Sequence, residues 1–471
     1  MKQGGLFSNT LLLGAASAIT KTLSFFLLPL YTSVLSPAEF GTADILVSTA
    51  VLLLPLASLY APEAVFRFYT AGERGAIRCG LLLLGIGSCT FALLLPLLGF
   101  SMLLRPYLGL LYLYVFCSIL RSFMAHVVRA DGEFLLYALQ QLFCALLTMG
   151  LQFFFLYVRR LGVWGYLLAV IVADGITFLL LLFLHYGQVK KNGAVTRVLF
   201  YRMLRYSVPL IPTALLWWVL SISDRYFILH FHGEAVTGLY AAAGRLPSLL
   251  SFAVGVFLEA WHYAALRQRE GEQGSLFGRI YKLLLPSLFL LAGGLILVSG
   301  PLVRLLLSSE YESAAALLPL LLFASLCGGL ASFLDSIYTL KLSTRSSLYT
   351  SFVAAVCNLA LNFLLIPRHA ALGAALSTAI SYALLLLVRL WHTRRFLSFS
   401  RQSAYLLPAL ALMLTAAILY SLGHRITASL ILLFSLLVLW RLILRAALFF
   451  GRRGVILLKD LKKRKEYRRK I

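Results

Sequence analysis

Acidic residues are scarce in this chain, which carries 17 Asp and Glu against 42 Lys and Arg, for a formal net charge of +25. Charged residues of both signs make up only 13% of the 471 residues, whereas 61% are hydrophobic. A water-soluble fold of that composition would expose far too much apolar surface. The basic residues are also spread along the chain rather than gathered on one soluble face, so we expect no nucleic-acid partner.

Motifs for cofactors, metals and nucleotides are missing as well. The six cysteines form no CxxC pair and have no histidine at ligand spacing, so they are interpreted as small apolar packing residues. No GxxxxGK[ST] motif occurs, which excludes ATP hydrolysis by this chain. The sequence therefore predicts no cofactor and no metal site.

What the chain does have is long hydrophobic runs, too long and unbroken for the alternating strands of an outer-membrane barrel. They predict an all-α polytopic membrane protein with about 14 transmembrane helices. The expected spans are 8–34, 41–62, 78–103, 107–126, 134–157, 162–184, 204–229, 236–260, 280–299, 313–338, 347–366, 370–391, 402–421 and 427–448.

Basic residues sit in every second connection. If the N-terminus is cytoplasmic, 33 of the 42 Lys and Arg lie on the cytoplasmic side and six face outward, while Lys21, Arg225 and Arg245 fall within spans. This bias predicts that both termini are cytoplasmic. The longest outer connection, around 300–313, is short, and no acid/base pair or nucleophile with a base lies on the outer side, so an enzyme is not expected.

The two halves of the chain resemble each other. Gly41 precedes Glu63 by nearly the same interval as Gly238 precedes Glu259, and GVWGYLLA at 162–169 matches AALGAALS at 370–377. Each half holds six spans, so we expect two six-helix lobes, 1–190 and 191–396, related by a pseudo-two-fold axis along the membrane normal. Two additional helices (397–450) and a basic cytoplasmic tail (451–471) follow. Coincidence among Gly- and Ala-rich helices is the alternative.

Charges within the spans are the candidate functional residues, because a charge at mid-membrane is costly unless it faces a wet cavity or a partner. Lys21 shares a small, polar helix face with Ser17 and Ser24, and Arg245 shares one with Ser248. These residues, with Trp217 of the seventh span, are predicted to line a substrate cavity. A helix-packing seam is the alternative for the small residues.

Other ionisable residues near the span ends are candidates for gating or coupling. Asp224 and Arg225 are sequence neighbours and are expected to point apart, with Arg225 able to snorkel to the interface. Asp44 is expected at a helix start, where the helix dipole stabilises an acid. A further set comprises Glu63 and Glu259, expected at equivalent inner ends of the halves, with Arg67 beside Glu63.

Two fixed cations at mid-membrane, Lys21 and Arg245, suit an anionic ligand such as a phosphate or pyrophosphate. A cationic drug exporter would be expected to have a cavity dominated by acids.

Three segments carry a resemblance to a known family: LSFFLLPLYTSVLSPAEFGTADIL at 23–46, RLLLSSEYESAAALLPLLLFA at 304–324 and NLALNFLLIPRHAALGAALSTAISY at 358–382. They resemble the bacterial polysaccharide flippases of the O-antigen (Wzx) type, in the multidrug/oligosaccharidyl-lipid/polysaccharide exporter superfamily. The resemblance implies two six-helix lobes around a central cavity in the bacterial cytoplasmic membrane. It also implies that an undecaprenyl-pyrophosphate-linked oligosaccharide crosses to the outer leaflet by alternating access, for cell-surface polysaccharide biosynthesis.

Two alternatives remain open, a lipid II-type peptidoglycan-precursor flippase and a cation-coupled multidrug antiporter. Related lipid II flippases line their cavity with several arginines in the first two spans, whereas this chain offers only Lys21 and Arg67 there. The expected partners are the lipid-linked oligosaccharide, anionic lipids at the basic tail, and polysaccharide polymerase or glycosyltransferase machinery.

Overall fold

A computed structural model describes residues 13, 14, 16, 17, 19, 20, 22, 23, 25–191, 193–266, 273–340, 344–394, 406–440 and 444. Over these residues the chain is helical and contains no strand. The all-α class predicted from the hydrophobic runs is therefore confirmed.

The described residues of the first half form the α-helices α2–α9 and three shorter helical turns. Helix α3 begins where Ser36 and Glu39 cap each other: the Ser36 hydroxyl accepts from the Glu39 backbone N–H (3.3 Å), and the Glu39 carboxylate accepts from the Ser36 N–H (3.0 Å). The elements are α2 (Leu28–Val34), α3 (Pro37–Ser58), α4 (Ala61–Thr70), α5 (Ala76–Leu94), η1 (Leu95–Phe100), η2 (Arg105–Tyr107), α6 (Leu108–Ala130), α7 (Phe134–Gln152), η3 (Phe153–Val158), α8 (Gly162–Lys191) and α9 (Arg197–Ser207).

The second half comprises α10 (Leu210–Arg245), α11 (Ser248–Leu266), α12 (Gln273–Leu297), α13 (Ser299–Leu306), η4 (Ser309–Ala316), α14 (Leu318–Leu340), α15 (Thr344–Thr393), α16 (Leu406–Ser421) and α17 (Arg425–Val438). Helices α10 and α15 each contain a break, at Gly233 (φ 80°) and at Ala370 (φ 48°). The chain folds back at Ala370: the Ser377 hydroxyl, after the break, donates to the Asn358 carbonyl, before the break, at 3.2 Å. Likewise the Tyr240 hydroxyl reaches the Asp224 carboxylate across the break at Gly233.

Nine described helical stretches are long and apolar enough to cross a membrane, and two of them, Arg197–Arg245 and Arg345–Thr393, run for 49 residues. A straight helix of that length would reach roughly 70 Å, more than twice the hydrocarbon core, so neither stretch is a single crossing. Arg345–Thr393 holds two crossings that meet at the break at Ala370, whereas Arg197–Arg245 holds α9, one crossing up to Gly233 and the start of a second that continues into α11. The predicted spans from 41–62 to 370–391 are helical over most of their described residues, and the last two, 402–421 and 427–448, lie partly outside the described residues. The predicted first span, 8–34, lies partly outside the described residues.

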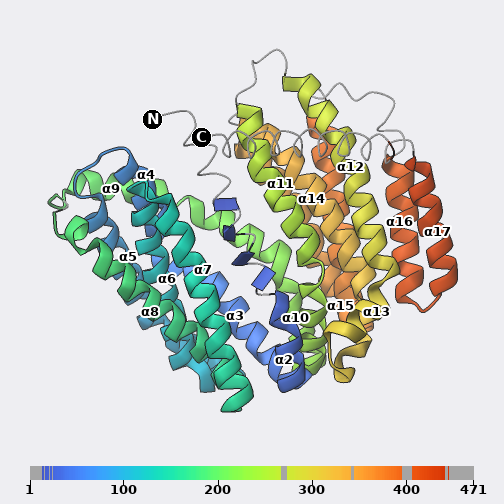
Figure 1. Ribbon diagram of the computed structural model, residues 1–471, viewed down its shortest axis with the longest axis horizontal. Coiled ribbons are helices and arrows are strands. Elements are labelled where there is room, and N and C mark those ends of the chain that lie inside the picture. Colours follow the sequence, from blue (N-terminus) through green and yellow to red (C-terminus); the bar gives the residue numbers. More distant parts are fainter. Residues whose placement is uncertain are drawn as a thin grey trace, which may run out of the picture.

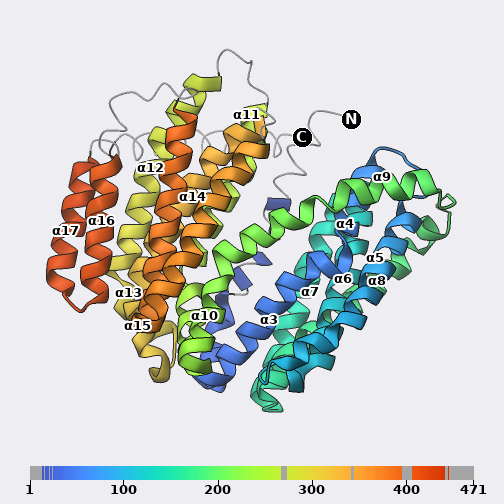
Figure 2. The ribbon, with the colours of Figure 1, turned by 180° about the vertical axis from the view of Figure 1, so that it is seen from behind.

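The helices form two lobes, seen side by side in Figures 1 and 2. The first lobe contains α2–α9 and the second contains α10–α15, while α16 and α17 pack on the outside of the second lobe, against α12 and α14. Helices α3 and α10 run against each other between the lobes. One hydrophobic core lies wholly in the first lobe, and a second extends from α2 and α3 into the second lobe.

The contact between α3 and α10 has pseudo-two-fold symmetry. A Cβ on Gly41 would lie 2.1 Å from the Glu234 carbonyl oxygen, and a Cβ on Gly238 would lie 1.8 Å from the Pro37 carbonyl oxygen. Glu234 follows Pro37 by the same number of residues as Gly238 follows Gly41, so the two contacts are reciprocal. The matching glycines of the two halves thus meet at one axis, where only glycine allows the backbones to approach so closely.

Helix α9 packs on the first lobe rather than the second. Its buried residues Leu199 and Met203 belong to the first-lobe core, and Arg202 forms an ion pair with Glu73 at 2.8 Å. The connection between the lobes therefore runs through a helix held on the first lobe. The expected boundary at 190/191 stays a prediction, and the tail 451–471 lies outside the described residues.

The lobes are joined at one end of the molecule, which we call the η4 end. There the Ser308 hydroxyl donates to the Thr32 carbonyl (2.6 Å), and the Tyr311 hydroxyl donates to the Leu35 carbonyl (3.0 Å). At the opposite end, called the α9 end, the lobes diverge (Figure 1). The two glycine contacts lie toward the η4 end.

Candidate functional site

A cavity of about 1060 Å³, the central cavity, lies between the lobes. Its walls come from α3, α6, α7, α8 and the first arm of α10. It extends from Tyr31, Gln152 and Tyr166, near the η4 end, to Tyr60 and Glu63 at the α9 end. The Tyr31 hydroxyl donates to the Gln152 amide oxygen at 2.5 Å, and its ring packs against those of Tyr166 and Phe40. This aromatic layer forms the floor of the central cavity.

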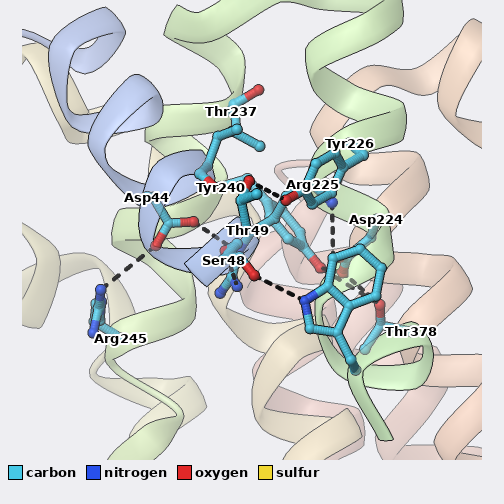
Figure 3. A network of polar contacts seen from close by, with 12 residues as sticks. Asp44, Ser48, Thr49, Asp224, Arg225, Tyr226, Thr237, Tyr240, Arg245 and Thr378 are labelled. Atoms are coloured by element: carbon cyan, nitrogen blue, oxygen red, sulfur yellow. Dashed lines mark hydrogen bonds and ion pairs between the residues drawn. The ribbon is translucent and has the colours of Figure 1, made fainter. Parts of the chain in front are cut away.

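Asp44 joins two arginines of the second lobe (Figure 3). One carboxylate oxygen lies 2.9 Å from Arg225 Nε and the other 3.5 Å from Arg245 Nη2. Asp44 stands well inside α3 rather than at its first turn, so its role is that of a shared counter-ion, not the expected helix start. Arg225 also donates to Ser48 (3.2 Å), so it points across to α3 and does not snorkel to the interface as expected.

The arginines of this cluster reach the cavities, and their counter-ion is buried behind them. The side chain of Arg245 is 38% exposed and that of Arg225 is 20% exposed, against 4% for Asp44. Arg245 lines the central cavity, whereas Asp44 is not among its lining residues. A ligand in the cavity therefore meets the guanidinium groups first.

A second ion pair of this kind lies in the first-lobe wall. Arg121 Nε donates to Asp174 at 2.6 Å, and Ser118 and Cys144 also donate to the Asp174 carboxylate. The Arg121 side chain is 27% exposed and that of Asp174 only 5%. Here again the cation is the more exposed partner, although Asp174 also lines the central cavity.

A smaller cavity of about 380 Å³, the second-lobe cavity, adjoins the first. Trp217 and Ser221 line both. Asp224 and Arg225 also line the second-lobe cavity and point apart, as expected: Arg225 turns to Asp44, whereas Asp224 accepts from Tyr240 and from Thr378 (3.2 Å).

Helix α3 is interrupted before it reaches the α9 end. Leu59 and Tyr60 both adopt left-handed backbone conformations (φ 47° and 54°), and α4 starts afresh at Ala61. This break turns Tyr60 and Glu63 into the wall of the central cavity. Burial raises the pKa of Glu63, and within the described part of the chain no basic side chain forms an ion pair with it. Its expected neighbour Arg67 instead stacks on the Tyr206 ring at 4.9 Å.

The residues predicted from sequence are distributed unevenly. Ser17, Trp217, Glu63 and Arg245 line the central cavity. Ser248 lines neither cavity; its hydroxyl donates to the Arg245 carbonyl (2.5 Å) where Pro247 separates α10 from α11. Lys21, Ser24 and the side chain of Glu259 lie outside the described residues.

The sequence pattern did not single out Arg121 as a cavity residue, because a basic residue near the inner end of a span is readily assigned to the adjoining cytoplasmic connection. A signal was present: Arg121 falls within the predicted span 107–126, one helical turn after Ser118. Asp174 is also an isolated acid within a predicted span. Each alone indicated a buried charge, but nothing in the sequence indicated that the two would pair.

Comparison with known proteins identifies the family and the fold. A family model described as "Polysaccharide biosynthesis protein" matches residues 6–262, more than half of the chain. No curated protein is similar enough in sequence to match.

Several solved structures are similar to this one. A structure of the lipid II flippase MurJ in an inward closed conformation has a TM-score of 0.68 at 14% identity, covering 94% of this chain and 100% of that one. An inward-facing multidrug resistance MATE transporter has a TM-score of 0.65 at 16% identity, covering 80% and 94%. A transporter of the same superfamily from Pyrococcus furiosus, noted for the reversed polarity of its binding pocket, has a TM-score of 0.60 at 15% identity, covering 82% and 95%. At these identities the likeness establishes the fold alone, that of a multi-pass membrane transporter.

Proposed function

The chain belongs to the polysaccharide biosynthesis protein family, and on that basis we propose that it is a flippase for an undecaprenyl-pyrophosphate-linked oligosaccharide. It would move this lipid from the cytoplasmic to the outer leaflet of the bacterial cytoplasmic membrane. The product would serve cell-surface polysaccharide synthesis, with polymerases or glycosyltransferases as functional partners.

The observation that carries the proposal is the order of charges in the cavity walls. Arg245 and Arg121 line the central cavity with side chains that are 38% and 27% exposed, whereas Asp44 does not line it and Asp174 lines it with a side chain that is only 5% exposed. Guanidinium groups bind phosphate oxygens strongly through charge-assisted, often bidentate hydrogen bonds. The paired acids, almost fully buried, hold the arginines in place and present little negative surface to the ligand. A carrier of organic cations would need the opposite arrangement.

The conformation supports alternating access. The central cavity is closed at the η4 end by contacts between Ser308 and Thr32 and between Tyr311 and Leu35, and it extends to Glu63 at the α9 end. With the predicted topology, the α9 end faces the cytoplasm, where lipid-linked oligosaccharides are assembled. The lobes would then separate at the η4 end to release the lipid outward.

Gating and coupling are assigned to the remaining charged residues. Glu63, with Glu259 and Arg67, is proposed to close the α9 end in the outward-facing state. Asp44 and Arg225 join α3 to α10 at the boundary between the lobes, and Asp224 lies beside Arg225 in the second lobe; a change of protonation or ion occupancy there would alter how these residues pack. Lys21 is proposed as an additional cation of the central cavity.

Reconstitution into vesicles tests this function directly. Purified protein is placed in vesicles containing a fluorescent undecaprenyl-pyrophosphate-linked disaccharide, and translocation is followed by loss of fluorescence to an impermeant quencher. We expect the wild-type protein to accelerate translocation, and Arg245→Ala to abolish most of the acceleration. Arg245→Lys should retain part of it, because the role is attraction of phosphate.

The alternative functions predict different substrates in the same assay. A peptidoglycan-precursor flippase would move lipid II faster than the disaccharide lipid, and a multidrug antiporter would move ethidium but neither lipid. Either outcome would overturn the proposal. Orientation is checked separately with an impermeant thiol reagent, which should label a cysteine at Ser309 from outside the cell but not one at Asp131.

A further inference from the structure

The two cavities differ in chemistry as well as size. The central cavity carries Arg121, Arg245, Asp174 and Glu63. Among the described residues, the charged lining residues of the second-lobe cavity are Asp224 and Arg225, and both are already engaged by protein groups. The other described lining residues are neutral: they supply hydroxyl groups, aromatic rings, glycines and a few apolar side chains such as Val254 and Leu321.

Trp217 stands where the two cavities meet. Its side chain is 40% exposed, and within the described part of the chain no group accepts its ring N–H. The next residue, Trp218, is different: its N–H donates to the Ser48 carbonyl at 2.9 Å, and its ring packs on Tyr226. Trp218 therefore anchors α10 to α3, whereas Trp217 offers a free aromatic face and a free donor.

We propose that the second-lobe cavity is a saccharide pocket in which Trp217 stacks on a sugar ring. This inference rests on the proposed function and divides the substrate between two sites: pyrophosphate beside Arg245, and sugars in the second-lobe cavity. A sugar ring has an apolar face that suits an indole, and an edge of hydroxyls that needs hydrogen-bond partners. Ser221 and Tyr382, whose hydroxyls lie 3.3 Å apart, and Ser325 supply such partners.

Size and composition agree with such a ligand. A volume of about 380 Å³ lies near the lower end of the range of roughly 300–1,000 Å³ found for small-molecule pockets, enough for a short saccharide. Four glycines, Gly244, Gly255, Gly328 and Gly329, leave room along the walls. Among the described lining residues, the one cation, Arg225, is already paired with Asp44, so a free phosphate would not be favoured there.

Binding of two lipids that differ only in the sugar tests the inference. The probes are undecaprenyl pyrophosphate and undecaprenyl-pyrophosphate-linked N-acetylglucosamine, titrated against the full-length protein in detergent. Trp217→Ala is expected to weaken binding of the sugar-bearing lipid about tenfold, the loss of one good aromatic contact, and to leave undecaprenyl pyrophosphate unchanged. Trp217→Phe should retain most of the affinity.

Two further variants keep the result interpretable. Ser251→Phe should block the pocket from its exposed side and reproduce the selective loss without altering Trp217. Arg245→Ala should weaken both lipids equally. If the wild-type protein binds neither lipid, the proposed function fails. If the wild-type protein binds both lipids and Trp217→Ala weakens the binding of both equally or of neither, the saccharide pocket is disproved and the proposed function stands.

Discussion

The Ser308 hydroxyl donates a 2.6 Å hydrogen bond to the Thr32 carbonyl, and the Ser308 backbone N–H points to the Thr32 hydroxyl at 3.4 Å. Two backbones from opposite lobes therefore lie side by side at the η4 end. Alternating access requires this contact to open in every transport cycle.

A disulfide at that place should stop transport. In the double variant Thr32→Cys/Ser308→Cys, oxidation is expected to lock the η4 end shut and abolish translocation in the vesicle assay, and a reductant should restore it. Each single variant serves as a control and should remain active under oxidant. Full transport by a protein shown to be cross-linked would rule out opening at this end.

The glycine contact predicts a shift between conformations. Ala at Gly41 or Gly238 would place a methyl group within about 2 Å of a backbone oxygen, which cannot move as a flexible side chain would. We expect either substitution to push α3 and α10 apart and to increase labelling of a cysteine at Leu35 by an impermeant thiol reagent. Gly150→Ala, which meets nothing within 4 Å, is the matched control and should leave labelling unchanged.

The counter-ion role of Asp44 predicts a graded loss of stability. Asp44→Ala leaves Arg225 and Arg245 without their acid, and the loss should fall between the roughly 1 kcal/mol of an exposed pair and the roughly 3–5 kcal/mol of a fully buried one, because both arginines reach the cavities. Arg225→Ala should cost more than Arg245→Ala, because Arg225 is closer to Asp44 (2.9 Å against 3.5 Å) and less exposed. Midpoints of thermal unfolding in detergent measure the order, and equal midpoints for all three variants would contradict it.

Glu63 predicts a pH dependence of this conformation. Burial raises its pKa, so the protonated carboxyl is favoured here. The protonated Glu63 carboxyl stabilises the conformation that is open at the α9 end. This stabilisation is fully present below the ordinary glutamate pKa of about 4.3 and is lost as pH rises through the raised pKa of Glu63 in this conformation. Spin labels at Ala71 and Tyr349, both exposed toward the α9 end, should therefore move closer as pH rises.

Glu63→Gln removes the ionisable group and should hold the α9 end open at every pH in that window. Glu310→Gln, on the exposed surface of the η4 end, is the control and should keep the wild-type response. A wild-type distance distribution that does not change with pH would leave Glu63 without a gating role.

The fold could be predicted from sequence because hydrophobic length and charge bias act over whole segments. The repeat was also visible, since Gly41 and Gly238 occupy matching positions and prove to contact one another's half. Pairing of charges was harder. Arg225 could snorkel or turn inward, and only the approach of α3 to α10 brings Asp44 within reach. Arg121 and Asp174 lie 53 residues apart, and no local periodicity links residues on separate helices.

The reciprocal contact of Gly41 and Gly238 has a consequence for how this chain can change. An isologous interface, in which each surface faces its own counterpart, is what two copies of one subunit form in a homodimer. Here the two copies are halves of a single polypeptide. An insertion beside Gly41 would therefore also disturb the contact made by Gly238, because both contacts join the same two helices. The two halves can diverge in the residues that line their cavities, as Arg245 and Ser48 at matching positions illustrate. Along the shared axis, both halves must keep a glycine at the contact.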